Sequence, residues 1–220
     1  FSMQDKPHAL AQPGLASTDP VLMQAARSER QDQRLLMIFE LAKILVAEDN
    51  QETMLSGFLS RLIASLDAAD AGSLWLYNAA EDRLAAADAQ GYALASLRQI
   101  RLAPGEAISG KVFQSGKSML WSTPDETAAA MANMTAENRQ LFVEATAGLG
   151  EALSALGVPL RTAGETSGVL AFLNLQQPGG FTNGDLDFLR RVADLLSLAI
   201  ENSRLREELH ITHAPNQANR

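Results

Sequence analysis

Apolar positions recur every three or four residues at both ends of the chain, which is the spacing of an amphipathic helix. This spacing predicts a first helix from Ser28, with a possible coiled-coil seam. A second helix follows, because Asp49 has capping-box spacing to the glutamate three residues later and an apolar face runs over 54–66. A last helix of about 27 residues opens at 182–185.

Between these helices the apolar period shortens to two, which is typical of strands. The predicted strands are 72–77, 83–89, 98–102, 118–121, 153–161 and 166–175. The first two and the last two strands form hairpins. Residues 108–114 form a short helix between glycines, and 123–150 form a long connection with a helix over 136–147 capped by Thr135.

This order of helices and hairpins predicts an α+β fold rather than a regular βαβ alternation. The strand 168–175 is apolar at both parities, so both faces of the sheet centre must be covered. Helices can cover one face. The other face needs the 105–150 segment, and a cavity can form there.

Composition narrows the function classes. Hydrophobic residues make up 46% of the chain and its formal net charge is -8, which fits an acidic globular protein and disfavours nucleic-acid or membrane-surface partners. Zero cysteines exclude a disulfide scaffold, a thiolate metal site and a cysteine nucleophile. The first 20 residues lack the pattern of a signal peptide, and no apolar run is long enough to span a bilayer, so we expect a cytoplasmic location.

We expect one domain with extensions. Residues 1–27 carry prolines and a glycine among small and polar residues, which predicts a flexible tail. Residues 28–209 form the single domain, including both terminal helices, and 210–220 form a linker or tail.

Catalytic chemistry has few candidates. The only histidines are His8, His210 and His213, at the chain ends, so the core offers none for a triad, a buried zinc site or a haem ligand. Residues 105–111 match the glycine and lysine spacing of a phosphate-binding loop, but Val112 stands where magnesium binding needs Ser or Thr. The glycines are better interpreted as turns that flank a short helix. We therefore expect no enzymatic activity.

Three stretches together give the chain a family likeness. The chain resembles the GAF domain family, the small-molecule-sensing modules of signalling proteins, over roughly 35–207. The stretches are LAPGEAISGKVFQSGK (102–117), LGVPL with GVL and LNL (156–175), and FT with DLDFL and then AIENSRL (181–205).

The resemblance implies a six-stranded antiparallel sheet with the first, second and last helices on one face. It places a ligand pocket on the other face, beneath a lid formed by 123–150. Members usually form parallel dimers through their first and last helices and pass a signal to an output domain. Here we expect a homodimer in a bacterial signal-transduction protein, with the output domain (kinase, cyclase or transcription regulator, as in two-component systems) outside this chain.

The same resemblance excludes several specialised activities. Family members that reduce free methionine sulfoxide or attach a bilin depend on cysteines, and this chain has none. In cyclic-nucleotide-binding relatives a base stacks on an aromatic ring where this chain has Ala89, and Leu175 and Leu186 replace a Lys and a Glu. We expect no haem, bilin or metal cofactor.

The ligand-binding candidates combine the resemblance with strand parity and lid composition. Ser73 on one face implies Trp75 and Tyr77 beside it, and Ala89 implies Ala85 and Ala87, whose small side chains leave volume. Methionines in the lid fit irregular apolar shapes. The candidate residues are Ser73, Trp75, Tyr77, Ala89, Gln90, Ile108, Ser109, Trp121, Met131, Met134, Arg139 and Phe142.

Two functions follow from this set. The first is a sensor that binds a small, mostly apolar or neutral ligand and transmits the signal through its terminal helices. The alternative is a dimerisation or scaffolding domain whose pocket is filled by its own side chains, because apolar pockets and cores share one composition.

Overall fold

The computed structural model describes residues 20–48, 50–176 and 178–213. The chain divides into two units, residues 1–36 and 37–220, and each is described by itself. The first unit contains the start of helix α1 (Pro20–Ala47), which begins before the expected Ser28. Residues 20–27 of the expected tail are therefore helical, and residues 1–19 lie outside the described residues. Of the expected linker, residues 210–213 belong to the last helix, and residues 214–220 lie outside the described residues.

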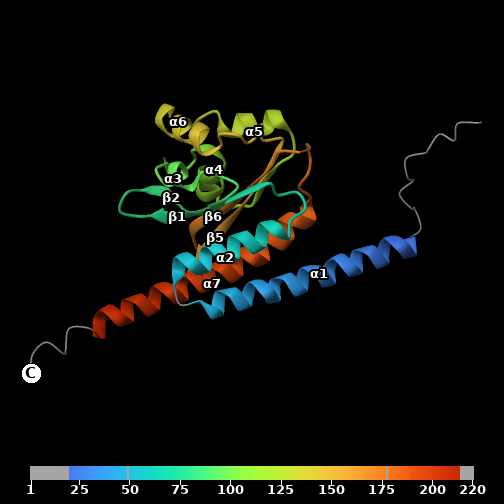
Figure 1. Ribbon diagram of the computed structural model, residues 1–220, viewed down its shortest axis with the longest axis horizontal. Coiled ribbons are helices and arrows are strands. Elements are labelled where there is room, and N and C mark those ends of the chain that lie inside the picture. Colours follow the sequence, from blue (N-terminus) through green and yellow to red (C-terminus); the bar gives the residue numbers. More distant parts are fainter. Residues whose placement is uncertain (1–19, 49, 177, 214–220) are drawn as a thin grey trace, which may run out of the picture. The chain divides into compact units, whose positions relative to one another are not determined.

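The second unit holds the remaining elements (Figure 1). The helices are α2 (Gln51–Ala64), α3 (Leu94–Leu97), α4 (Ala107–Ser115), α5 (Pro124–Met131), α6 (Ala136–Ala145) and α7 (Asn183–His213). The strands are β1 (Ala71–Asn78), β2 (Arg83–Gln90), β3 (Arg101–Leu102), β4 (Met119–Trp121), β5 (Ser154–Thr162) and β6 (Glu165–Asn174). They form one antiparallel six-stranded sheet in the order β3-β2-β1-β6-β5-β4, which confirms the expected α+β architecture.

Three local expectations differ from the structure. The expected strand 98–102 is instead a turn that follows α3 and then the two-residue β3. The 123–150 connection contains α5 in addition to α6, because Thr123 and Glu126 form a reciprocal capping box that starts a helix. Helix α2 is capped by Asn50, whose side chain accepts a hydrogen bond from Thr53 N at 3.0 Å; Asp49, the expected cap, lies outside the described residues.

A β-bulge corrects the expected row of alanines on β2. Trp75 pairs with Ala86 and Leu74 with Asp88, so the register shifts between these pairs. Ala89 therefore shares its face with Ala86, while Ala87 packs on the helix side of the sheet. Strand parity fails here because a bulge places two successive residues opposite one partner residue.

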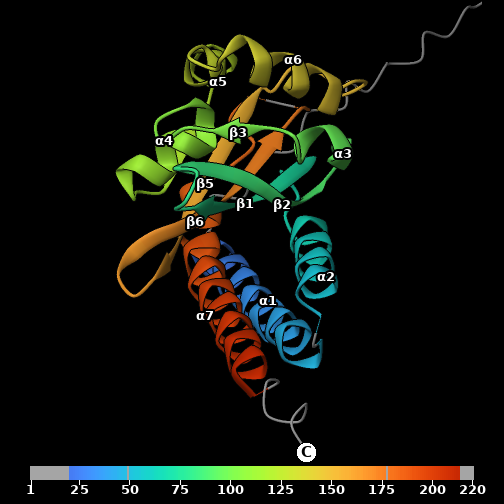
Figure 2. The same ribbon diagram turned by 90° about the vertical axis from the view of Figure 1, so that its left-hand side faces the viewer.

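Helices cover both faces of the sheet (Figure 2), and an apolar core lies between the sheet and the helices on each face. The larger core contains Leu41 of α1, Phe58 of α2 and Leu189 of α7, packed against Leu170 and other residues of the helix-side sheet face. The second core contains Trp75 of β1 and residues of α3 to α6 over the other face. Both faces are covered, as the apolar parity of β6 predicts.

Helix α7 begins with reciprocal hydrogen bonds between Thr182 and Asp185, at the expected position. Its sheet-facing side is buried, whereas Leu198 is 62% exposed. Among the described residues, no helix combines the length and the apolar character needed to cross a membrane.

Candidate functional site

A cavity of about 30 Å³ lies between the sheet and the helices α4 to α6. This volume is enough for a water molecule but not for a metabolite. The cavity is lined by Ser73, Trp75, Tyr92, Leu97, Ile100, Leu102, Ala107, Ile108, Ser109, Met131, Met134, Phe142, Ala171 and Leu173. A larger molecule therefore needs displacement of the side chains that form the walls.

Uncharged polar groups enter this apolar lining from three elements. Trp75 Nε1 donates a hydrogen bond to Ser73 Oγ at 2.9 Å, which fixes both side chains on β1. Ser73 is also hydrogen-bonded to the phenol of Tyr92. Ser109, on α4, is 5% exposed and lies in the wall of the cavity. Hydroxyl groups at the edge of an apolar cavity can orient a ligand that carries a single polar function.

Tyr92 connects the cavity to the 123–150 segment. Burial raises the pKa of the Tyr92 phenol well above its usual range, and the hydrogen bond with Ser73 lowers it by less, so the phenol stays protonated at neutral pH. Its ring lies 6.4 Å from the ring of Phe142 on α6. The next residue, Ala93, donates its backbone N–H to Ala145 O at 2.8 Å. The loop after β2 and helix α6 therefore form one wall.

The structure brings seven of the twelve candidate residues to the cavity. They are Ser73, Trp75, Ile108, Ser109, Met131, Met134 and Phe142. They come from β1 in the sheet and from α4, α5, α6 and the turn between α5 and α6, which cover this face of the sheet.

The other five candidates lie away from the cavity lining. Tyr77 stacks on Phe113 with ring centroids 4.5 Å apart, and its hydroxyl donates to Asp82. Ala89 is buried in the adjoining core. Arg139 is exposed and donates to the carbonyl oxygens of Ala132 and Met134. Gln90 and Trp121 are partly buried at strand positions outside the lining.

Seven lining residues were not among the candidates. They are Tyr92, Leu97, Ile100, Leu102, Ala107, Ala171 and Leu173. Strand parity could have identified Ala171, because it pairs with Ser73 across β1 and β6. No spacing signal marks Tyr92, which follows a glycine with a positive φ in a loop.

A buried carboxylate attaches the 123–150 segment to the turn before α4. Glu106 is 6% exposed, and its carboxylate accepts hydrogen bonds from the backbone N–H groups of Ala103 and Thr135 and from Asn138 Nδ2. Burial raises the pKa of Glu106, but the hydrogen bonds from Asn138, Thr135 and Ala103 together outweigh it, so the pKa lies below its ordinary value. We call Glu106, Asn133 and Asn138 the latch residues.

Asn133 makes the second connection. Its Oδ1 accepts from Ala107 N at 3.0 Å and from Lys111 Nζ at 2.6 Å, while its Nδ2 donates to Gly105 O at 2.8 Å. Lys111, the lysine of the phosphate-loop-like spacing, is thus engaged with the α5–α6 turn.

The glycines of that spacing serve the same turn. Gly105 has a φ of +85°, and its N–H donates to Gly110 O at 2.8 Å. A Cβ at Gly110 would lie 2.5 Å from Ala103 O, so only glycine fits there. Both glycines are required by the backbone geometry that positions Glu106.

The polar groups in the cavity lining are hydroxyls and an indole N–H. None of the described residues that line it is charged. In the described part of the chain, no three His, Cys, Asp or Glu side chains group in a way that could hold a metal ion. His8 and the side chains of His210 and His213 lie outside what the structure describes. The arrangement suits a small uncharged molecule.

Comparisons with solved structures extend over most of the chain. The GAF domain of an Acinetobacter phosphoenolpyruvate-protein phosphotransferase is 19% identical with a TM-score of 0.65, covering 78% of this chain and 94% of that one. The corresponding domain from Coxiella burnetii is 21% identical with a TM-score of 0.66, covering 80% and 97%. Free methionine-R-sulfoxide reductase from Neisseria meningitidis, in complex with its substrate, is 19% identical with a TM-score of 0.60, covering 77% and 89%.

These identities establish similarity of fold alone. No curated protein matches the chain. The sequence profile described as the GAF domain matches residues 48–201, which is more than half of the chain and includes every strand of the sheet. The chain therefore belongs to the GAF domain family.

Proposed function

We propose that this GAF domain is a sensor that binds a small, neutral, mostly apolar molecule in the cavity beneath the 123–150 segment. The observation that carries the proposal is the cavity lining, which has no charged residue and is apolar except for the hydroxyls of Ser73, Tyr92 and Ser109 and the indole N–H of Trp75. A charged ligand would lose its hydration without gaining a partner there.

The 123–150 segment is suited to act as a lid. It contributes Met131, Met134 and Phe142 to the cavity wall, and methionine side chains adapt to irregular shapes. Its attachment to the turn before α4 depends on hydrogen bonds of the latch residues, which can break and re-form without loss of the sheet. Entry of a ligand larger than the present cavity would use this movement.

Signal transmission would involve a homodimer of the terminal helices. Exposed large apolar side chains in the second unit are concentrated on α1 and α7, at Phe39, Val46, Leu198 and Leu205, with Val143 on α6 as the exception among the described residues. Such exposed apolar patches mark interaction surfaces. A ligand acts through this interface only if its affinity differs between two helix arrangements.

The alternative function is dimerisation or scaffolding without a ligand. The small size of the cavity, about 30 Å³, favours this alternative, because the side chains of the wall already fill most of the space. We expect no catalysis in either case. The reductase with a similar fold acts on methionine sulfoxide, and by resemblance that chemistry depends on cysteine, which this chain lacks.

Thermal unfolding in the presence of a metabolite collection separates the two functions. Neutral apolar metabolites, cyclic nucleotides and dicarboxylates form the three arms. If the domain is a sensor, at least one neutral compound raises the melting temperature. At a concentration of 100 Kd, binding adds about 3 kcal/mol to the free energy of unfolding. No shift in any arm supports scaffolding, and a shift with charged compounds alone contradicts the proposed ligand class.

A variant that fills the cavity tests the location. Ala171 lines the cavity and Ala128 is exposed on α5. Ala171→Leu is expected to abolish the ligand-induced shift, whereas Ala128→Leu retains it. A shift that persists in Ala171→Leu, with its secondary structure intact, would place the ligand elsewhere.

A further inference from the structure

An open groove of about 430 Å³ lies at the end of α4 that is farther from the cavity. Its walls come from the turn between α4 and β4, the end of β5 and the first half of α7. The first turn of α4 lines the cavity, whereas the residue that caps its other end lines the groove, so the two are separate sites. The side chains with polar groups in the groove are Lys117, Ser118, Arg161, Arg190 and Asp194.

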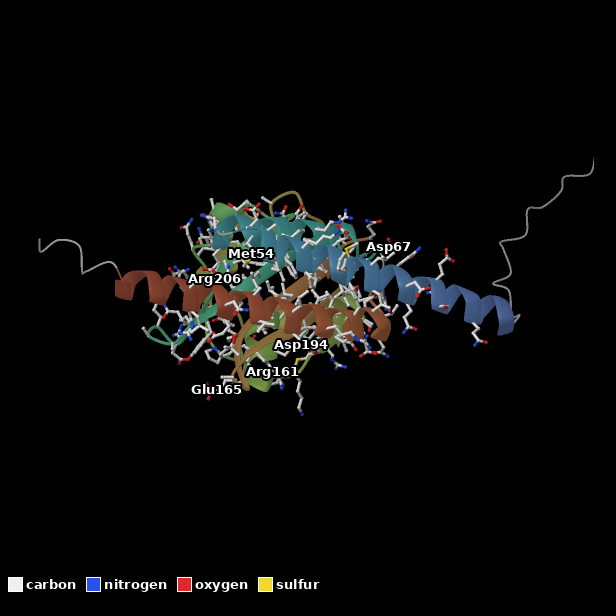
Figure 3. All side chains as sticks on the ribbon, turned by 90° about the horizontal axis from the view of Figure 1, so that it is seen from below. Met54, Asp67, Arg161, Glu165, Asp194 and Arg206 are labelled. Carbon is white, nitrogen blue, oxygen red and sulfur yellow. The ribbon has the colours of Figure 1, made fainter. Side chains whose placement is uncertain are left out.

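The groove concentrates positive charge on an acidic protein. Three of its side chains are cationic and one is a carboxylate, which gives the lining a net charge of +2, although the whole chain carries -8. Figure 3 labels Arg161 and Asp194 on this part of the surface. Charges farther away than about 8 Å are largely screened at physiological ionic strength, so the local charge decides which ligands the groove attracts.

Hydrogen bonds within the chain hold the guanidinium of Arg190 in place. Its Nε donates to Ser118 Oγ at 3.1 Å, and its Nη1 donates to Asp187 Oδ1 at 3.0 Å. Within the described residues, no hydrogen bond uses Arg190 Nη2 or the hydroxyl proton of Ser118. Donors that are already ordered lose less conformational entropy when they bind an anion.

Arg161 is oriented by the turn that ends α4. Its Nη2 donates a hydrogen bond to the carbonyl oxygen of Gly116, the C-cap of this helix. Gly116 has a φ of +60°, a left-handed conformation that glycine adopts most readily. The other N–H groups of this guanidinium have no partner in the described part of the chain, so they remain available to a ligand.

Lys117 adds a charge that no neighbouring group compensates. Of its hydrogen-bonding groups, the backbone N–H donates to Ser115 Oγ, while the ammonium has neither a hydrogen bond nor an ion pair among the described residues. Like charges in one groove repel one another, and Asp194 offsets only one of the three. An anion bound between these side chains would remove the remaining repulsion.

These donors suit a phosphate monoester. Guanidinium groups match the geometry of phosphate oxygens, and an ammonium group adds a compact charge. A phosphate monoester carries a charge of about -1.5 to -2 at pH 7 and three strong acceptor oxygens. Its charge is therefore close to the opposite of the net charge of the lining, and it is concentrated on one group.

We propose that this groove is an anion-binding site for a small molecule that carries a phosphate monoester, held by Lys117, Arg161 and Arg190 and by the hydroxyl of Ser118. The site goes beyond the sensor function proposed above, because its ligand class is the opposite of that expected for the cavity. It does not depend on whether the cavity binds a neutral molecule.

Calorimetric titration of the full chain with glycerol phosphate at pH 7.5 and constant ionic strength tests the proposal, with succinate and glycerol as comparison compounds. Glycerol phosphate is expected to bind saturably and more tightly than succinate, and glycerol is expected not to bind. Lys117→Gln and Arg190→Gln should each raise the dissociation constant about fivefold. Arg191→Gln, at the next and exposed position of α7 outside the groove lining, changes the net charge equally and should leave the dissociation constant unchanged.

Asp194→Asn should have the opposite effect, because it removes the carboxylate that repels an anion in the groove. We expect the dissociation constant of glycerol phosphate to fall by about twofold or more. Glu137→Gln removes a negative charge from an exposed position of α6 outside the groove and is the matched control. A dissociation constant that is unchanged in Asp194→Asn, or that falls equally in both variants, would contradict the site.

Saturable binding that depends on Lys117 and Arg190 but not on Arg191 supports the proposal. Equal weakening in Arg191→Gln would show attraction by net charge alone and would overturn it, as would the absence of saturation at millimolar glycerol phosphate. Tighter binding of succinate would overturn the ligand class. A thermal shift that a neutral metabolite causes in both the wild type and Lys117→Gln belongs to the cavity, so the two proposals can fail separately.

Discussion

Glu106 and Asp88 are buried carboxylates with opposite surroundings. Glu106 accepts hydrogen bonds from three groups, whereas Asp88, 4% exposed, has an Oδ2 without a hydrogen-bond partner in the described chain. Burial raises the pKa of Asp88, and its hydrogen bond from Ala89 and the charge of Arg98 only partly offset this effect. The two residues are expected to affect stability in opposite directions.

Glu106→Gln is expected to lower the free energy of unfolding by about 1–3 kcal/mol at pH 7, because it removes a charged acceptor from a buried group of donors. The folded-state pKa is below the ordinary value of 4.5, so the stabilising effect of the carboxylate is present above that pH. It is lost as the pH falls through the folded-state pKa. Urea titrations at several pH values measure this difference.

The exposed Glu137, in the same segment, provides the matched control. Glu137→Gln should change the free energy of unfolding by less than about 0.5 kcal/mol. An equal loss in both variants would mean that the latch hydrogen bonds do not stabilise the fold.

Asp88→Asn is expected to raise the free energy of unfolding at pH 7, on the order of 1 kcal/mol, because a charge without full pairing leaves the interior. The folded-state pKa of Asp88 lies above its ordinary value of 3.8, so its penalty is present at neutral pH and disappears as the pH falls toward that value. The advantage of the variant should therefore shrink on acidification, the reverse of the Glu106 result. A variant less stable than the wild type at pH 7 would contradict this interpretation.

At the scale of elements, the helices α5 and α6 are held differently from the strands. Ala130, Met134 and Ala145 bury their side chains in the cavity-side core, and Met131 and Phe142 pack against it only partly buried. Hydrogen bonds add to this attachment, among them those of the latch residues. Elements with fewer apolar contacts open first. We expect 124–145 to exchange amide hydrogens faster than β5 and β6.

Asn133→Ala should increase exchange in 124–145 by about tenfold or more, because it removes the hydrogen bonds to Ala107, Lys111 and Gly105 at once. Hydrogen exchange followed by mass spectrometry measures this, and 154–174 should change little. Gln140→Ala, at an exposed position of α6, is the control. Equal acceleration of amide exchange in 124–145 and 154–174 would indicate global destabilisation rather than local opening of 124–145.

Elements whose signals are local could be predicted from the sequence. The hairpins, the short helix α4 and the start of α7 follow from apolar period, glycine positions and the Thr182–Asp185 cap. Helix α5 was missed because its apolar side is only alanine and methionine, although Thr123 and Glu126 carried a capping signal. The two-residue β3 is set by pairing with Leu84 and Ala85, which is a tertiary contact.

The cavity was harder to predict than the fold. Parity correctly placed Ser73 and Trp75 together, since β1 alternates regularly. Strand parity failed on β2, because the local sequence carries no signal for the bulge at the register shift between Leu74 and Trp75. Tyr92 and the latch residues Glu106 and Asn138 come together only through the path of the loops, so their contacts have no signature along the chain.

At the scale of the whole molecule, the proposed dimer makes stability depend on concentration. If the terminal helices pair, folding and association are coupled, and a 100-fold increase in protein concentration should raise the melting temperature by about 4 °C or more. Leu198→Glu places a charge on the exposed apolar face of α7 and should make the melting temperature independent of protein concentration. Scanning calorimetry at two concentrations measures both, and a concentration-independent wild type would argue against the dimer.

The sheet is a single layer between its two cores, and β1 contributes alternately to both. Ser73 and Trp75 face the cavity, whereas Leu74, between them, belongs to the core shared with α2 and α7. If a molecule in the proposed site shifts the backbone of β1 at Trp75, the same shift moves Leu74 on the other face, because consecutive side chains hang from the same backbone. A reporter dye attached near the middle of α7 would then detect a change on the helix side when the cavity side is filled.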